Sequence, residues 1–197
     1  MSLYNFAPCS TLSQMHSFVS WENTFSDEEL DSLIEYLDQL EKVEASIGEG
    51  NTDNIIRKST VSWVKNDSPQ AALLYDRMAF VARSLNAKFY GFDLYGFVED
   101  MQYTIYYGDE EGHYTWHTDM SETSSSTRKF SMILQLSDPN DYEGGELQTL
   151  IGSDHSAVVK QKGLIAAFPS WTLHRVTPVT KGIRKTIVVW VAGPQFK

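Results

Sequence analysis

Apolar residues recur at helical spacing in two stretches of the first half of the chain. The first stretch follows Ser26, a favoured residue at a helix N-terminus, and Glu29 completes a capping box three residues later. The second follows Ser68, has Pro69 in its first turn and ends near Asn86. Both stretches predict amphipathic helices. The first has an apolar face made of Leu30, Leu33, Ile34, Leu37, Leu40 and Val43, and the second has a mostly apolar face made of Leu73, Leu74, Arg77, Met78, Val81, Ala82 and Leu85.

From Phe89 onward, aromatic and β-branched residues broken by turn signals replace the helical spacing. Short strands at such intervals are typical of a closed or sandwiched antiparallel β structure, and we expect the two helices to brace its outside. The predicted strands comprise residues 60–64, between the helices, and then 92–97, 102–107, 114–119, 129–137, 146–151, 157–159, 164–168, 172–177 and 184–192.

Composition narrows the class of protein. The 197 residues suffice for one well-buried domain, residues 1–197. The 26 acidic and 16 basic side chains give a net charge of -10, which disfavours general binding to nucleic acids or anionic membranes. Cys9 is the only cysteine, which excludes an internal disulfide framework and fits a reducing, cytoplasmic compartment. Neither the first 20 residues nor any later apolar run indicates secretion or a membrane span.

His117 and Asp119 are the main candidates for chemistry. Alone they are a weak signal, because five histidines and 26 acidic residues give about even odds of one such match by chance. On a strand, however, residues i and i+2 project from the same face, so both side chains would point one way. A distant histidine, His174, would complete a face of two imidazoles and one carboxylate. Such a face leaves three octahedral positions open and favours Fe(II) over structural zinc.

Three motifs in order carry a family resemblance between about Gln102 and Val191. They are Gly-His-Tyr-Thr-Trp-His-Thr-Asp at 112–119, Leu-Ser-Asp-Pro through Tyr-Glu-Gly-Gly-Glu-Leu at 136–147, and Phe-Pro-Ser through Leu-His-Arg-Val-Thr-Pro-Val at 168–179. In these motifs the sequence resembles the 2-oxoglutarate and Fe(II)-dependent dioxygenases of the prolyl 4-hydroxylase-like branch, especially the bacterial PKHD-type hydroxylases. The first hundred residues match this family only in general style.

The resemblance implies an α+β fold whose core is a double-stranded β-helix, that is, a jelly-roll or cupin-like arrangement of antiparallel strands braced by N-terminal helices. Residues 1–100 would form the helical and β support region, and residues 101–197 would form the core with the iron site. In this core His117 and Asp119 would lie on the second strand and His174 on the seventh.

The resemblance also implies a binding site for the cosubstrate. Arg184, on the eighth core strand, would bind the distal carboxylate of 2-oxoglutarate through two parallel hydrogen bonds. Thr186, two residues on and hence on the same face, would supply a hydroxyl donor. Further family positions near the cosubstrate match Tyr107, Tyr114 and Trp190, whereas Gln135 departs from a tyrosine found in some relatives. Either the Gln135 amide replaces that contact or the contact is absent.

The activity implied is hydroxylation of an unactivated C–H bond, with Fe(II), 2-oxoglutarate, dioxygen and ascorbate as reductant. The expected substrate is a prolyl or other residue of a peptide or protein, and a small molecule is the alternative; the oligomeric state stays open. We expect substrate selection in residues 120–127 and 152–156 and in the loop before Val61. A noncatalytic metal- or 2-oxoglutarate-binding module is the competing interpretation, and a cupin-like sugar-binding or isomerase fold is a third.

The acidic run 109–111 and the two tryptophans near the motifs, Trp116 and Trp171, each allow a structural and a functional interpretation. The acidic run 109–111 is read as a solvated turn, although its closeness to the site leaves room for a basic substrate. Trp116 and Trp171 would serve either as packing residues or as an aromatic rim that holds substrate.

Overall fold

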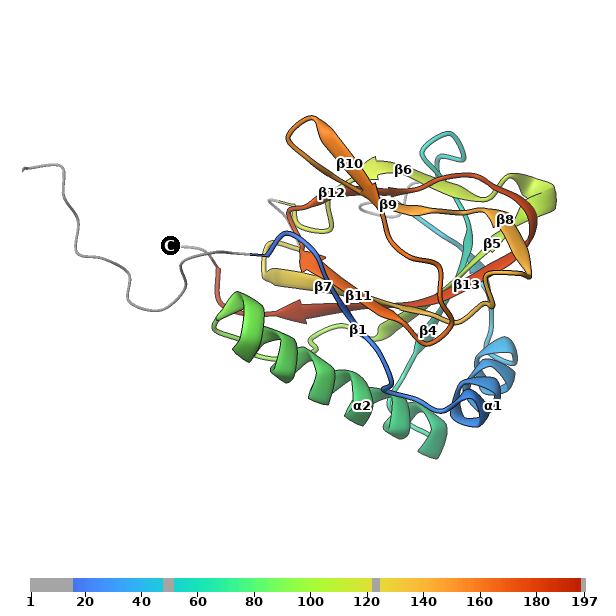
Figure 1. Ribbon diagram of the computed structural model, residues 1–197. Helices are drawn as coiled ribbons and strands as arrows, with labels where there is room; N and C mark the ends of the chain where they lie inside the picture. The colour runs from blue at the N-terminus through green and yellow to red at the C-terminus, as the bar shows by residue number, and fades with distance from the viewer. Residues whose placement is uncertain (1–15, 48–51, 122–124, 196–197) are drawn as a thin grey trace, which may run out of the picture.

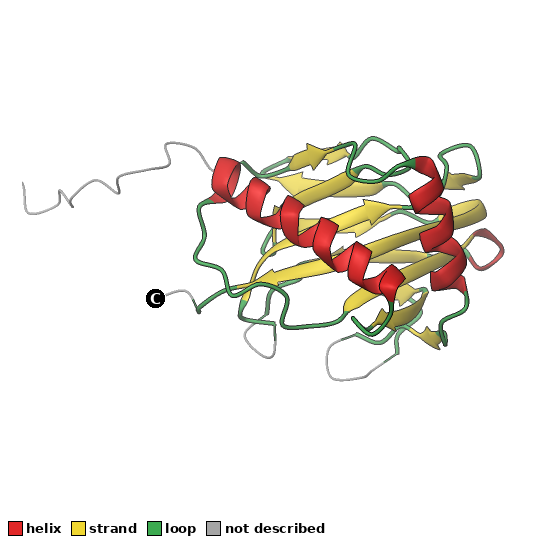
Figure 2. Cartoon of the chain, turned by 90° about the horizontal axis from the view of Figure 1, so that it is seen from below, coloured by secondary structure: helices red, strands yellow, loops and turns green. Residues whose placement is uncertain are grey.

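The protein consists of two facing antiparallel sheets, with both helices on the outer side of the larger sheet (Figures 1 and 2). The structure is a computed structural model and describes residues 16–47, 52–121 and 125–195. Cys9, part of the loop before Val61 (residues 48–51) and part of residues 120–127 (residues 122–124) lie outside the described residues. Within the described residues, no helix is long and apolar enough to cross a membrane.

The larger sheet contains eight strands within the described part of the chain and forms the floor of the site. Along the sheet these are β1 (Val19–Trp21), β11 (Ile165–Pro169), β7 (Arg128–Gln135), β13 (Val179–Ala192), β5 (Met101–Tyr107), β4 (Thr60–Val64) and β2 (Val43–Glu44), with β8 (Tyr142–Gly144) paired to β13 off this path. The long strand β13 therefore lies in the middle, hydrogen-bonded to β7 and β5.

The smaller sheet covers the opposite side of the site. Its order is β10 (Asp154–Ala157), β9 (Leu147–Ile151), β12 (Leu173–Val176), β6 (His113–His117) and β3 (Arg57–Lys58). Within the described residues, the strand pairs of both sheets are all antiparallel, as expected for a double-stranded β-helix.

Helix α1 (Asp27–Asp38) and helix α2 (Pro69–Leu85) begin where the sequence predicts. Ser26 accepts a hydrogen bond from the backbone N–H of Glu29, whose carboxylate in turn accepts from the N–H of Ser26 at 2.9 Å. Ser68 caps α2 in the same way, through the N–H of Ala71. The predicted face of α1 extends too far, because the helix ends at Asp38 and Val43 instead pairs with Val61 in the sheet.

Strand boundaries differ from the predicted ones where pairing rather than local sequence decides them. Residues 92–97 form no strand, and only Gly96 makes an isolated bridge, to Ala192. Strand β13 begins five positions before the predicted start at Arg184, because Val179 to Gly182 pair with the short strand β8. The strands β1, β2, β3 and β8 escape prediction because two or three residues carry no detectable alternation.

The main hydrophobic core lies between the helices and the larger sheet. Alternate residues of each central strand enter this core, and on β13 these are Ile187, Val189 and Val191. The intervening side chains face the smaller sheet, and on β13 they include Arg184 and Thr186. One face of the sheet thus supplies stability, and the other supplies the groups of the site.

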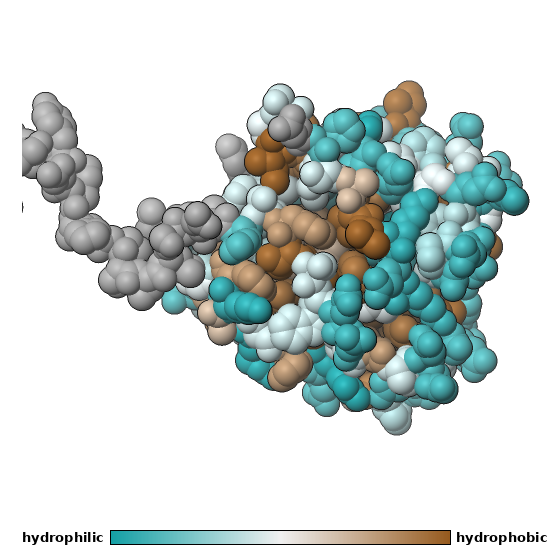
Figure 3. Space-filling view, in the orientation of Figure 1, coloured by the Kyte–Doolittle hydropathy of each residue, from teal (hydrophilic) through white to brown (hydrophobic). Residues whose placement is uncertain are grey.

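The outer surface mixes polar and apolar side chains. On the face in Figure 3, apolar groups gather near the middle and hydrophilic groups surround them. Elsewhere large apolar side chains are exposed singly on different elements, as with Phe80 on α2 and Ile151 on β9. Scattered exposure of this kind is ordinary for a folded domain.

Candidate metal centre

Strand β6 and the turn that follows it bring two candidate ligands to the site. In the pairing of β6 with β12, His117 lies opposite His174 and Tyr114 lies opposite Val176, so β6 has one residue more than its partner. This bulge places Tyr114 and His117 on the same side, although three positions separate them.

Asp119 lies beyond the end of β6, in contrast to the predicted strand 114–119. Its backbone N–H donates to the carbonyl oxygen of Ser170 at 2.9 Å, which fixes the turn against the end of β11. The carboxylate therefore reaches the site through a turn held by this hydrogen bond, and not through the alternation of a strand.

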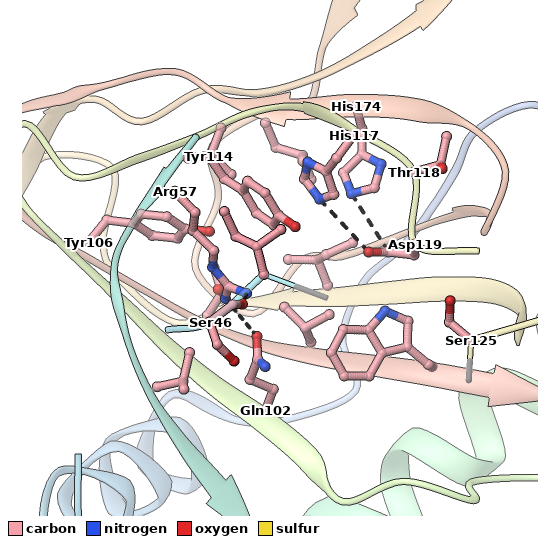
Figure 4. Close-up of a pocket in the computed structure, with 18 of the residues that line it drawn as sticks. Ser46, Arg57, Gln102, Tyr106, Tyr114, His117, Thr118, Asp119, Ser125 and His174 are labelled. Atoms are coloured by element: carbon pink, nitrogen blue, oxygen red, sulfur yellow. Dashed lines mark hydrogen bonds and ion pairs between the residues drawn. The ribbon is translucent and has the colours of Figure 1, made fainter. Parts of the chain in front are cut away.

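The three predicted ligands meet in one cluster. The ligand atoms of His117, Asp119 and His174 all lie within 4.8 Å of one another. Nε2 of His117 is 3.8 Å from Oδ1 of Asp119, and Nε2 of His174 is 3.6 Å from Oδ2 (Figure 4). All three side chains are largely buried, with at most 14% of the surface exposed.

Hydrogen bonds to the backbone orient both imidazoles. Nδ1 of His117 lies 2.8 Å from the carbonyl oxygen of Thr115, and Nδ1 of His174 lies 2.9 Å from that of Thr172. Because a carbonyl oxygen only accepts, each Nδ1 carries a proton, and Nε2 is the ring nitrogen that remains to hold a metal. Burial, together with the neighbouring His174, lowers the pKa of His117 to about 3, so its imidazole is neutral at pH 7.

The carboxylate of Asp119 is held ionised. Burial alone would raise its pKa, but the two histidines and the hydrogen bond from Ser131 outweigh burial and lower the pKa of Asp119 below its usual value. The Ser131 hydroxyl donates to Oδ2 at 2.6 Å. The donor set is thus two imidazole nitrogens and one carboxylate, which suits Fe(II) with open coordination positions.

Replacing Ser131 with alanine is expected to lower metal affinity by about 10- to 100-fold, the usual cost of losing a hydrogen-bonded partner of a ligand. The variant removes the hydroxyl that orients Asp119 and leaves all three ligands in place. Titration calorimetry with Mn(II) measures the effect. Ser84→Ala, which removes a hydroxyl on α2 bonded to a helix carbonyl, is the control. Equal Mn(II) affinity in both variants would contradict this role for Ser131.

A cavity of about 400 Å³ extends from this cluster between the two sheets. The smaller sheet contributes Tyr114 and both histidines, and the larger sheet contributes Arg184 and Thr186. A volume of this size accommodates a small organic acid beside the metal ligands.

Arg184 is the most deeply buried cation in the described lining of this cavity. Only 2% of its surface is exposed, and within the described part of the chain it forms no ion pair. Its guanidinium lies 5.3 Å from the ring centroid of Tyr106, and its Nε has no hydrogen-bond partner. A buried charge without a counter-charge is costly, so the geometry suits an anionic ligand. Thr186, which is 1% exposed, lines the same cavity.

Gly145 leaves the space that the Arg184 side chain occupies. A Cβ atom at Gly145 would lie 2.9 Å from Cδ of Arg184 and 2.8 Å from Cγ2 of Val179, and its φ is +61°. We expect Gly145→Ala to weaken 2-oxoglutarate binding by about tenfold, because displacing the guanidinium costs a charge-assisted hydrogen bond. Gly152→Ala is the matched control, with a similar φ of +65° but open space around the added carbon. Calorimetry measures the affinity of each variant for 2-oxoglutarate, and equal affinities in Gly145→Ala and Gly152→Ala would contradict the prediction.

The remaining predicted residues fall into two groups. Tyr114 and Trp190 line the cavity, and the Tyr114 ring stacks on His117 with centroids 3.4 Å apart. Tyr107 instead packs against the main core, and its neighbour Tyr106 lines the cavity, because alternation along β5 sends adjacent side chains to opposite faces. Gln135 is buried outside the cavity lining, and its amide donates to the carbonyl oxygen of Val159 at 2.7 Å.

Trp116, Trp171 and the acidic run 109–111 do not line the cavity. Trp116 stacks with Arg175, whose guanidinium is 4.5 Å from a ring centroid, and Trp171 packs edge-on against Phe92 at 5.7 Å. Both tryptophans therefore have packing contacts, in line with the first of the two readings.

Two cavity arginines were missed by sequence reasoning. Arg128, at the start of β7, pairs with Glu99, donates to the carbonyl oxygen of Asp119 at 3.0 Å and lies 3.8 Å from the ring centroid of Trp190. The second is Arg57 on β3. Alternation gave no signal for Arg128, because the residues of β7 that face the site, Ser131 and Ile133, are at odd positions. The pairing of β7 with β13 shifts register next to Arg128.

Comparisons with known proteins show which family of proteins this chain is similar to. Residues 101–192 match the family model of the 2OG-Fe(II) oxygenase superfamily. This match and the relatives described next confirm the resemblance that the motifs predict.

Among curated relatives, a PKHD-type hydroxylase of Synechococcus sp. (strain CC9311) is 39% identical over 83 residues, which cover 42% of this chain and 38% of the relative. A PKHD-type hydroxylase of Picosynechococcus sp. is 43% identical over 79 residues, or 40% of this chain and 36% of the relative. The matched region thus spans less than two fifths of the length of each relative.

Solved structures extend the likeness to most of the fold. A prolyl hydroxylase from Trichoplax adhaerens, in complex with a hypoxia inducible factor peptide fragment, superposes with a TM-score of 0.76 at 16% identity, over 89% of this chain and 83% of that one. A prolyl-4-hydroxylase from Pseudomonas putida gives 0.73 at 18% identity, over 90% and 93%. The predicted double-stranded β-helix with bracing helices is confirmed, whereas the division into residues 1–100 and 101–197 stays a prediction.

Proposed function

We propose that this protein is an Fe(II)- and 2-oxoglutarate-dependent oxygenase that hydroxylates an unactivated C–H bond. The observation that carries the proposal is the presence of Arg184, a buried cation that forms no ion pair with any described residue, in the same cavity as the His117, Asp119 and His174 cluster. A cluster of metal-binding side chains alone fits many functions. Such a cluster beside a buried binding site for an anion fits a cosubstrate that chelates the metal at one end and carries a carboxylate at the other.

Each side chain has a defined task in this proposal. His117, Asp119 and His174 would hold the iron, which supplies the oxidising chemistry that couples decarboxylation of 2-oxoglutarate to hydroxylation. Arg184 and Thr186 would bind the distal carboxylate and so fix the orientation of the cosubstrate. Both histidine Nδ1 protons are held by carbonyl oxygens, so neither imidazole rotates during turnover.

The substrate proposed is a peptide or protein, with a prolyl residue as the first choice of target. Support comes from the structural likeness to prolyl hydroxylases, one of which is in complex with a peptide fragment. We also propose ascorbate as the reductant that keeps the iron ferrous. A cytoplasmic, reducing location is supported by the presence of one cysteine in 197 residues.

Succinate release from 2-oxoglutarate, in the presence of Fe(II) and ascorbate, tests the proposal. We expect turnover by the wild type, stimulated by a suitable peptide, and none by His174→Ala or Arg184→Ala. His155→Ala and Arg77→Ala are matched controls, because His155 is exposed on β10 and Arg77 is exposed on α2. Absence of succinate from the wild type with every peptide, despite bound metal and 2-oxoglutarate, would favour the noncatalytic interpretation.

A further inference from the structure

Arg57 is a second buried arginine that reaches into the cavity from the edge of the smaller sheet. It lies on β3, opposite Tyr114 in the register with β6, and only 7% of its surface is exposed. Its Nη2 donates to Oε1 of Gln102 on β5 at 2.9 Å, and its Nε donates to Oγ of Ser59 at 3.0 Å. The side chain thus links the two sheets across the cavity (Figure 4).

Among the residues that the structure describes, every hydrogen-bond partner of Arg57 is neutral. Besides Gln102 and Ser59, these comprise only the backbone carbonyl oxygen of Ser46, at 3.5 Å. The carboxylates that line the cavity are Glu44 and Asp119, and neither forms an ion pair with Arg57 among the residues described. Arg57 therefore carries a positive charge that the described structure buries and does not neutralise.

The other two arginines of the cavity have different tasks. Arg128 is paired with Glu99, so its charge is already compensated. Arg184 is the anchor proposed for the cosubstrate. In a protein with a net charge of -10, the described lining of the cavity thus contains three arginines and two acidic side chains, and among these arginines Arg57 is the one left for another anion.

Stacked rings place Arg57 close to the metal ligands. Its guanidinium carbon lies 4.7 Å from the ring centroid of Tyr114, and that ring is parallel to His117 within 13° at a centroid distance of 3.4 Å. One aromatic ring therefore separates the guanidinium from a candidate iron ligand. An anion bound to Arg57 would lie beside the position where the C–H bond is attacked.

The adjacent wall is apolar and reaches the surface. Val61 is buried there, whereas Val43 and Trp63 are 46% and 44% exposed and form part of the cavity lining. A group that enters along this wall meets apolar surface first and the Arg57 charge inside. The acidic run 109–111 is not part of this lining, so it gives no support to a basic substrate.

We propose that Arg57 binds a carboxylate of the substrate next to the hydroxylated carbon, so that this enzyme selects acidic substrates. The inference rests on the proposed oxygenase function and adds the substrate class. Two sources share the required chemistry. One is an aspartate or glutamate side chain beside the target residue of a peptide, and the other is the free α-carboxylate of an amino acid or a peptide C-terminus.

Two variants separate the charge of Arg57 from its contacts. Arg57→Gln removes the cation. Gln102→Glu keeps Arg57 and replaces its amide partner with a carboxylate of the same shape, which can accept the same hydrogen bonds from Arg57 and Thr104. In the second variant the new carboxylate therefore neutralises the charge of Arg57. This variant keeps the test valid even if Arg57→Gln does not fold.

The test measures retention of paired probes by the full chain loaded with Mn(II) and 2-oxoglutarate, using ultrafiltration and mass spectrometry. One arm uses proline-centred peptides with Asp or Glu against the same peptides with Asn or Gln. The other arm uses L-proline against L-prolinamide. We expect the wild type to retain the acids of at least one arm about tenfold better than the amides. Both Arg57→Gln and Gln102→Glu should lose this preference.

Equal retention of acids and amides by the wild type in both arms, including no retention of either, would overturn the inference. An acid preference that persists in both variants would do the same. Calorimetric measurement of 2-oxoglutarate binding to the same preparations distinguishes a failure of the Arg57 inference from a failure of the proposed function. If the wild type binds 2-oxoglutarate without acid preference, only the Arg57 inference fails, whereas failure to bind 2-oxoglutarate counts against the proposed function.

Discussion

Asp119→Ala is expected to lose metal binding by more than about 100-fold and to have no measurable turnover. Loss of a partner that merely orients a ligand costs about 10- to 100-fold in affinity, and Asp119 supplies the only carboxylate of the cluster. The substitution also leaves two buried imidazoles without the negative charge that lies within 4 Å of both. Mn(II) binding, followed by calorimetry, measures the first effect, and succinate release measures the second.

Two comparisons make this prediction specific to the carboxylate. Asp119→Asn keeps the shape and an acceptor for the Ser131 hydroxyl but removes the charge, so we expect metal affinity between that of the wild type and that of Asp119→Ala. Asp109→Ala changes an exposed carboxylate outside the cavity lining and serves as control. If Asp119→Ala retained both metal and turnover, the assignment of the ligands would be wrong.

Arg184→Lys is expected to raise the 2-oxoglutarate concentration needed for half-maximal turnover by about 10- to 100-fold. Lysine keeps the charge but replaces a planar fork with a point charge, so one of two parallel hydrogen bonds to the carboxylate is lost. The maximal rate should change less, because the substitution does not touch the metal ligands. Steady-state kinetics with varied 2-oxoglutarate separates these two effects.

The matched control for this prediction is Arg77→Lys, the same substitution on the outer helix α2, where the guanidinium contacts Glu29 and the Thr24 carbonyl oxygen. Metal affinity measured in parallel shows whether the centre itself is intact. A 2-oxoglutarate requirement that is unchanged in Arg184→Lys would mean that another group anchors the cosubstrate.

The elements that local sequence determines were predictable. Ser26 and Ser68 act through hydrogen bonds within one helical turn, so the starts of both helices follow from a few neighbouring residues. The end of α1 does not, because no glycine or proline stops the helix near Asp38 and the pairing of Val43 with Val61 decides the conformation there. Residues 92–97 have the composition of a strand but find no partner beyond the bridge of Gly96.

The three side chains of the candidate metal centre were predictable for a different reason. His117, Asp119 and His174 come from motifs whose order indicates a family, and the structure brings them together although Asp119 is not on the predicted strand. The sequence could also have indicated that Tyr106, and not Tyr107, lines the cavity. In strand β5 the polar residues Gln102 and Thr104 mark the face of the site, and continuing this alternation leads to Tyr106.

Arg57 could not have been found in this way. It belongs to a strand of two residues, far in sequence from the motifs, and its position depends on the pairing of β3 with β6. Its importance arises from what surrounds it, namely burial, neutral partners and a ring stacked on His117. None of these properties is encoded locally.

The central claim is that the cavity couples 2-oxoglutarate to oxygen insertion into a substrate. Mass spectrometry of a peptide and protein library, incubated with the protein, Fe(II), 2-oxoglutarate, ascorbate and ¹⁸O₂, tests this claim most directly. The account predicts products that carry one added ¹⁸O atom and that disappear with Asp119→Ala or without 2-oxoglutarate. Products with the same label in the absence of 2-oxoglutarate, or no labelled product from a protein that binds both metal and 2-oxoglutarate, would contradict it.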